Sequence, residues 1–137
     1  MAVMTLKAQP EPTTLEEMKA AACAQVRDRR WRSHVVVTVG GVDFVSDDTA
    51  ATRLTAAITA RQAAQALGLE AVDATAGWEA KDGTMVPMTL SDLRGLLLAG
   101  VARTQAAFDR QAQLTAEIKA AETSEALAAI DLDSGWP

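Results

Sequence analysis

The side chains best placed to do chemistry gather in one short stretch, GWEAKDG, at residues 77–83. Trp78 could form a platform for a ligand, while Glu79 or Asp82 could act as a general acid or base. Paired carboxyl groups perform that chemistry in a concave, partly dry setting that drives their pKa values apart. The same letters also describe a strand that runs into a tight turn, because Asp82-Gly83 lies between two short extended runs. The register of such a hairpin decides between the two interpretations.

A two-residue turn at Asp82-Gly83 sets this register. Four side chains then share one face, which we expect to be buried: Trp78, Ala80, Met85 and Pro87. Glu79 and Lys81 lie on the opposite, wetter face. The carboxyl groups therefore do not converge on Trp78, and catalysis is not expected. We interpret Trp78, Asp82 and Gly83 as residues of the core and the turn.

The single histidine, His34, and the single cysteine, Cys23, offer a second kind of chemistry. A Cys–His pair can form a nucleophile and its base, but these two lie across the end of a predicted helix and no third group joins them. No second histidine or cluster of cysteines accompanies His34, so a zinc site is not expected. We interpret His34 as a structural or surface residue. A lone cysteine forms no internal disulfide and favours a reducing compartment.

Three aspartates, Asp43, Asp47 and Asp48, form a small acidic cluster that could bind a divalent cation. The spaced loop of an EF-hand is absent, and Asp47 or Asp48 is well placed to cap the helix that follows. We therefore interpret Asp43 as a residue that faces water and the other two as candidates for the cap. The sequence predicts no catalytic residue, no cofactor-binding residue and no metal ligand.

The run RDRRWR at residues 27–32 is markedly basic. It could bind an anionic partner, such as nucleic acid, a membrane or an acidic protein surface, but it also suits a solvated helix end, where cations interact with the helix dipole. We favour the helix end, and among partners we favour protein. A formal net charge of -5 opposes general affinity for nucleic acid, and no apolar run approaches the ~18 residues that cross a membrane. The candidate partner-contact residues are Arg27, Arg29, Arg30, Arg32 and Trp136.

The elements that position these residues follow from periodicity and turn signals. Helices are predicted at about 13–31, 46–68, 89–118 and 123–131. Gly40-Gly41 suits a two-residue hairpin turn, which pairs Val39 with Val42 and Val37 with Phe44 on one face. With the second hairpin at 77–88, the predicted order is α-β-β-α-β-β-α-α. This is an α+β fold in which two short antiparallel hairpins pack against alanine-rich helices and a long C-terminal helix.

The chain divides into an extended N-terminal arm at 1–12, an α+β domain with the long helix at 13–122, and a short helix with a tail at 123–137. Two prolines in QPEP keep the arm extended. With only two Phe, three Trp and no Tyr, the core must come from closely packed helices with few large anchors. Gly95 and Gly100 lie inside the long helix, and the sequence leaves open whether the helix is continuous there.

Several of these stretches occur in an order that resembles a known family. RDRR at a helix end is followed by VTVGGVDFVSDD, WEAKDGTMVPMT, the long helix, IKAAETSEALAAID and a final GWP. This resembles an uncharacterised domain family carried by bacteriophage tail-fibre and tail-fibre-assembly proteins. The resemblance covers roughly Leu15 to Pro137, and its most specific pieces are 44–47, Trp78 with Asp82-Gly83, and 118–137.

The resemblance implies a non-enzymatic component of the phage tail, in the fibre or baseplate region, made in the host cytoplasm and carried in the virion. Its partners would be other tail or fibre proteins, and the symmetry of phage tails implies a homo-oligomer within the assembly. No cofactor, nucleic acid or membrane is expected. Two alternatives stay open: a tail-fibre assembly chaperone that is absent from the mature virion, and a small enzyme or regulator that uses the basic run 27–32.

Overall fold

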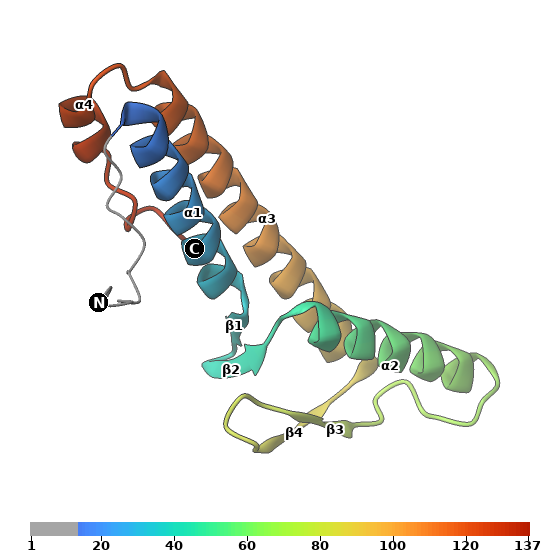
Figure 1. Ribbon diagram of the computed structural model, residues 1–137. Helices are drawn as coiled ribbons and strands as arrows, with labels where there is room; N and C mark the ends of the chain where they lie inside the picture. Colours follow the sequence, from blue (N-terminus) through green and yellow to red (C-terminus); the bar gives the residue numbers. More distant parts are fainter. Residues whose placement is uncertain (1–13) are drawn as a thin grey trace, which may run out of the picture.

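The computed structural model describes residues 14–137 and has two parts that meet at an elbow (Figure 1). One part, the shaft, holds α1 (Leu15–His34) and α3 (Leu90–Ala120) side by side in opposite directions, with α4 (Ser124–Ala128) at its far end. The other part, the foot, holds α2 (Asp48–Ala66) and two hairpins: β1 (Val36–Val39) with β2 (Val42–Val45), and β3 (Ala76–Glu79) with β4 (Met85–Met88). This confirms the predicted α+β class and element order. The predicted arm at 1–12 lies outside the described residues.

The helices begin where the sequence predicts caps. Four side chains accept a hydrogen bond from a main-chain N–H of the first turn and so begin the four helices: Thr14, Asp47, Thr89 and Thr123. At α3 the bond is reciprocal, because the Asp92 carboxylate accepts from the main-chain N–H of Thr89 at 2.9 Å. Local side-chain chemistry therefore sets the start of each helix.

The end of α1 lies beyond the predicted end near Trp31, at His34. The Ser33 hydroxyl donates to the main-chain oxygen of Arg29 at 2.8 Å, and His34 Nδ1 lies 3.0 Å from the main-chain oxygen of Arg30. Both side chains are buried. These contacts satisfy two polar side chains within the last turn, so the helix continues until it meets β1.

The long helix α3 is continuous through both of its internal glycines. A Cβ atom at Gly95 would meet nothing within 4 Å, so Gly95 faces open space. A Cβ atom at Gly100 would lie 3.6 Å from Cβ of Ser46, an ordinary contact distance. Each glycine costs a helix about 1 kcal/mol relative to alanine. The neighbouring side chains of Leu93, Leu96 and Leu97 pack in one cluster with Leu54 and Ile58 of α2, which supports α3 in this region.

The first hairpin has the predicted register, with Val37 opposite Phe44. Gly40 and Gly41 form its turn at φ +59° and +78°, the conformation that a two-residue hairpin turn requires. Val37 and Phe44 are both buried, which confirms that the predicted face is the core face.

The predicted register of the second hairpin is wrong by one residue. Trp78 lies opposite Val86 instead of the proline that follows it. The turn is longer than predicted, because the main-chain N–H of Ala80 donates to the main-chain oxygen of Thr84 at 2.8 Å and leaves residues 81–83 as the loop.

The physical reason lies in the backbone of this loop. The two-residue turn that Asp-Gly favours is type I′, which needs positive φ at both central residues. In this loop Gly83 alone adopts positive φ, at +89°, and no non-glycine residue of the described chain does. The longer loop with glycine at its last position also lets the N–H of Lys81 donate to the main-chain oxygen of Asp43 at 2.8 Å. Met85 and Pro87, expected on the core face, are exposed. The inward-facing side chains are Trp78, Ala80, Val86 and Met88.

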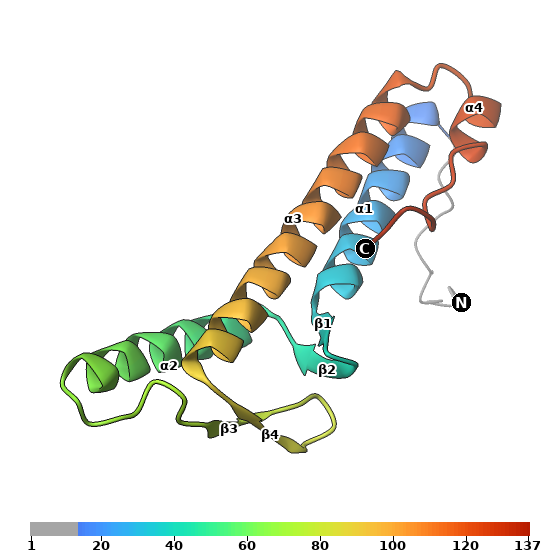
Figure 2. The same cartoon turned by 180° about the vertical axis from the view of Figure 1, so that it is seen from behind.

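Two apolar clusters form the core, one in each part of the elbow. The cluster of the foot joins the hairpins to α2 and to the first turns of α3, and Phe44 is its most buried large side chain. The cluster of the shaft centres on Val26, Leu114 and Ile118. Figure 2 shows the C-terminal tail returning along α1, where it covers this second cluster.

Candidate functional site

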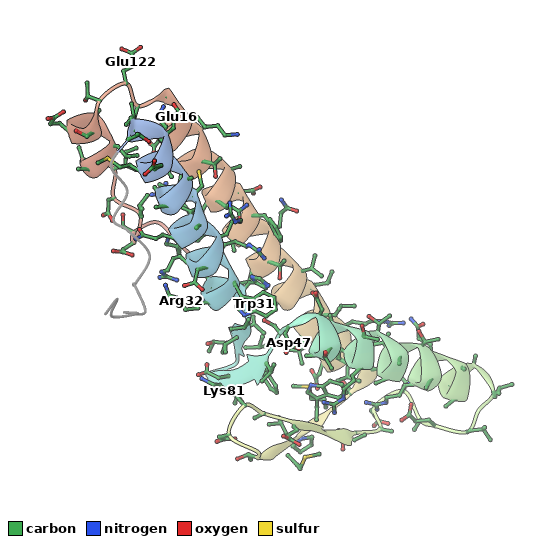
Figure 3. The ribbon with its side chains drawn as sticks, viewed as in Figure 1. Glu16, Trp31, Arg32, Asp47, Lys81 and Glu122 are labelled. Atoms are coloured by element: carbon green, nitrogen blue, oxygen red, sulfur yellow. The ribbon has the colours of Figure 1, made fainter. Side chains whose placement is uncertain are left out.

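An apolar groove of about 340 Å³ opens at the elbow, between the start of α2, the middle of α3, the first hairpin and Trp78 of β3. Figure 3 shows Trp31 at the end of α1 and Asp47 at the start of α2, both at this junction. The apolar side chains that shape the groove are Val45, Leu54, Trp78, Leu97, Val101 and Phe108. We call this feature the groove.

The groove exists because α3 carries more apolar side chains than its neighbours cover. Leu97, Val101 and Phe108 recur at helical spacing and share one side of α3. All three are apolar residues at the spacing of a helix face that packs on a core, yet Val101 is 57% exposed. The β2–α2 connection reaches α3 at Gly100, where Ser46 fits against the bare backbone. The β2–α2 connection and α3 therefore meet at Gly100, and α2 and α3 diverge beyond it.

Two arginines cover the aromatic walls of the groove. The guanidinium of Arg30 lies 4.3 Å from the ring centre of Phe108, and that of Arg53 lies 5.5 Å from the ring centre of Trp78. Both distances suit cation–π attraction. Asp48 is the one carboxylate among the residues that line the groove. Neither arginine lines the groove itself, and Asp47, which caps α2, lies at the same junction. The groove therefore has apolar walls, and charged side chains of both signs lie around it.

The predicted basic run divides between internal contacts and the surface. Arg30 donates from Nε to Oε1 of Gln111 at 3.0 Å, which ties α1 to α3. Arg29 lies over the ring of Trp136 at 5.6 Å. Arg32 pairs with Asp28 at 3.3 Å on the exposed side of α1. The candidate Arg27 is also exposed, so the run does not form one continuous basic surface.

Trp136 lies against its own chain. Its Nε1 donates to the main-chain oxygen of Leu132 at 2.9 Å, and its ring packs on the shaft cluster. Arg103 and Arg110 hold the same tail by donating to the main-chain oxygens of Pro137, at 2.8 Å, and Ser134, at 3.0 Å. Trp136 is partly buried by these contacts, and its role in partner contact stays a prediction.

The stretch GWEAKDG does not bring its carboxyl groups together around a pocket. Asp82 lies in the turn, where its carboxylate accepts from the main-chain N–H of Thr84 at 2.9 Å. This hydrogen bond lowers the pKa of Asp82. Glu79 is exposed, while Trp78 faces the groove. Of the residues in this stretch, Trp78 is the one that reaches the candidate site.

The other candidate chemical groups have structural contacts. Cys23 is a free thiol packed beside the shaft cluster. The His34 ring contacts the rings of Trp31 and Phe108. Asp47 caps α2, and Asp43 accepts from the Thr38 hydroxyl at 2.6 Å. Between residues 14 and 137, no three side chains of His, Cys, Asp or Glu are grouped so as to hold a metal ion.

Arg61 is the buried residue that sequence reasoning missed. It lies on α2 and donates to Oε1 of Glu70 at 3.0 Å, to the main-chain oxygen of Met88 at 2.8 Å and to that of Ala74 at 2.6 Å. The signal was present in the sequence, because Leu54, Ile58 and Arg61 share one helical face and the first two are buried. An arginine that continues an apolar stripe is a candidate for burial, and burial then requires hydrogen-bond partners for its guanidinium.

Comparison with known proteins gives one match. A family model described as a domain of unknown function (DUF4376) matches residues 17–132. No curated protein and no solved structure matches the chain. The resemblance to tail-fibre proteins is not addressed by this match and stays a prediction. In the described part of the chain, every helix is too short or too polar to cross a membrane.

Proposed function

The chain belongs to the DUF4376 family, a domain of unknown function, and we propose that it is a non-enzymatic protein of the bacteriophage tail. In this proposal it is a structural or adaptor component of the fibre or baseplate region that acts through protein–protein contacts at the groove, with tail or fibre proteins, copies of this chain included, as partners. The tail assignment rests on the sequence resemblance. The mode of action rests on the geometry of the groove.

The observation that carries the proposal is an apolar groove left open to solvent in an otherwise well-packed elbow. Contiguous exposed apolar surface with a polar rim marks sites of protein contact. Aromatic side chains and arginines are the residue types enriched in such contacts. The groove presents the aromatic rings of Trp78 and Phe108, and beside it Arg53 and Arg30 lie over these two rings.

The polar groups of the groove favour binding over catalysis. The Ser46 hydroxyl donates to the main-chain oxygen of His34, so it is not paired with a base. Thr104 and Gln105 supply neutral polar atoms, and Asp48 supplies a single carboxylate. The two carboxyl groups with a lowered pKa, Asp82 and Asp131, lie outside the groove. This arrangement suits an anchor for apolar side chains.

The experiment is mass spectrometry of purified particles of the phage that encodes the chain. Particles are made with the wild-type protein, with Val101→Asp in the groove, and with Leu98→Asp as a matched control on α3. Leu98 is 69% exposed and does not line the groove. We expect the wild-type and Leu98→Asp proteins in the particle, and at least a tenfold lower copy number for Val101→Asp.

The wild-type result separates this proposal from the chaperone alternative. If the wild-type protein is absent from particles but makes co-expressed fibre protein soluble, the chain is an assembly chaperone and the structural proposal is wrong. Equal copy numbers for Val101→Asp and Leu98→Asp would show that the groove is not the contact surface.

A further inference from the structure

A second apolar feature protrudes from the opposite end of α2. Leu67, Leu69 and Val72 are 74%, 79% and 81% exposed. They lie in the connection that follows α2, at the tip of the foot, far from the elbow (Figure 1). Single exposed apolar residues are ordinary, but three within six residues form a patch. We call these three side chains the knob.

The backbone beneath the knob is held in place. Gly68 ends α2 at φ +72°, and the N–H of Leu69 donates to the main-chain oxygen of Ala64 at 2.8 Å. Glu70 is held by Arg61, which also donates to the main-chain oxygen of Ala74 at 2.6 Å. The knob therefore keeps its side chains outward, and a preorganised surface loses little entropy on binding.

The knob and the groove of one chain cannot meet. They lie at the two ends of α2, a helix of 19 residues, which spans roughly 28 Å at the standard rise per residue. An apolar knob at one end and an apolar groove at the other match the two halves of a head-to-tail contact between copies. Such a contact closes into a ring or continues as a filament, depending on the rotation between copies.

We propose that the knob of one copy seats in the groove of a second copy, which makes the second copy of this chain the partner of the groove. This inference rests on the proposed function, because it takes the groove to be a protein-docking site. Charge favours the same pairing. Asp73 in the knob segment is exposed, and Arg53, which lies over the ring of Trp78 at the groove, is exposed as well and has the opposite charge.

The test uses complementation between two variants of the full chain, measured by sedimentation velocity over a concentration series. Leu69→Asp damages the knob and leaves the groove intact, whereas Val101→Asp damages the groove and leaves the knob intact. We expect each variant alone to need at least tenfold higher concentration than wild type to associate. Leu98→Asp, the matched control, associates like wild type.

The decisive sample is the equimolar mixture of the two variants. Each retains one intact half of the contact, so the mixture forms a one-to-one dimer that neither variant forms alone. Circular dichroism spectra like that of wild type confirm that each variant is folded. A mixture that stays monomeric overturns the proposal, because it shows that the knob and the groove do not bind each other.

The outcomes also separate this inference from the proposed function. If the wild-type chain stays monomeric at high concentration while Val101→Asp is lost from phage particles, the groove binds a different tail protein and the self-contact is wrong. If the variants complement each other but the wild-type protein is absent from particles, the self-contact holds and the tail assignment is wrong.

Discussion

Arg61 and Glu70 form an ion pair at 3.0 Å between α2 and the connection that follows it, with side chains only 10% and 20% exposed. The same guanidinium also holds β4, by donating to the main-chain oxygen of Met88 at 2.8 Å. One side chain therefore joins three segments of the foot. Because the groove has a wall on α2 and another on β3, the shape of the groove depends on this pair.

Replacing Arg61 with alanine removes the cation beside Glu70, which keeps only the Gln65 amide at 3.3 Å, and takes this donor from the main-chain oxygens of Met88 and Ala74. We expect a loss of about 3 kcal/mol in the free energy of unfolding, since breaking a largely buried ion pair leaves an uncompensated charge. Arg53→Ala on the same helix is the matched control. It removes an exposed cation–π contact and should cost less than about 1 kcal/mol. Urea denaturation measures both, and equal losses would contradict the role assigned to Arg61.

Replacing glycine with alanine should change the stability of the fold in opposite directions at Gly83 and Gly95. Gly83→Ala places a side chain at φ +89°, and we expect it to destabilise the fold by about 1 kcal/mol. Gly95→Ala adds a Cβ atom with nothing within 4 Å inside α3, so we expect it to stabilise the fold by up to about 1 kcal/mol. Melting temperatures that move in the same direction for both variants would contradict this difference.

The parts of the fold that follow from neighbouring residues could be predicted from the sequence. Helix caps and the turn at Gly40-Gly41 depend on local hydrogen bonds and on glycine, so the helix starts were predicted to within about two residues and the first hairpin was predicted correctly. Asp47 was one of the candidate caps of α2, and the structure selects it. Asp82-Gly83 is compatible with a short or a longer turn, and the choice involves a contact from Lys81 to the first hairpin. A single sequence does not contain that tertiary contact.

The groove could not be predicted from the sequence for the same reason. The groove arises where α2 and α3 diverge beyond Gly100, and the spacing of Val101 and Phe108 does not tell a covered stripe from an open one. The burial of Arg61 could have been inferred from the sequence, because Arg61 continues the apolar face of Leu54 and Ile58 on α2. Trp78 was correctly placed on the inward face, although its cross-strand partner was wrong.

The Asp82 carboxylate makes the stability of the second hairpin depend on pH. The hydrogen bond from Thr84 lowers its pKa in the folded chain below the ordinary value of 3.8. A lowered pKa stabilises the fold above that value, and the contribution is lost as pH falls through the lower, folded pKa. Asp82→Asn cannot titrate, so its melting temperature should lie below that of wild type at neutral pH and approach it in acid. A constant difference at all pH values would contradict this account, and NMR titration of the carboxyl carbon checks the pKa directly.

The contacts of Trp136 predict that the C-terminal tail contributes to stability. Its ring packs on the shaft cluster and its Nε1 donates to Leu132 at 2.9 Å, so Trp136→Ala should lower the free energy of unfolding by about 2 kcal/mol. Trp31→Ala is the control, because this exposed ring should cost less than about 1 kcal/mol. Denaturant titration of both variants measures the difference. If Trp136→Ala unfolds like wild type but is lost from phage particles, then Trp136 acts in partner contact instead of holding the tail.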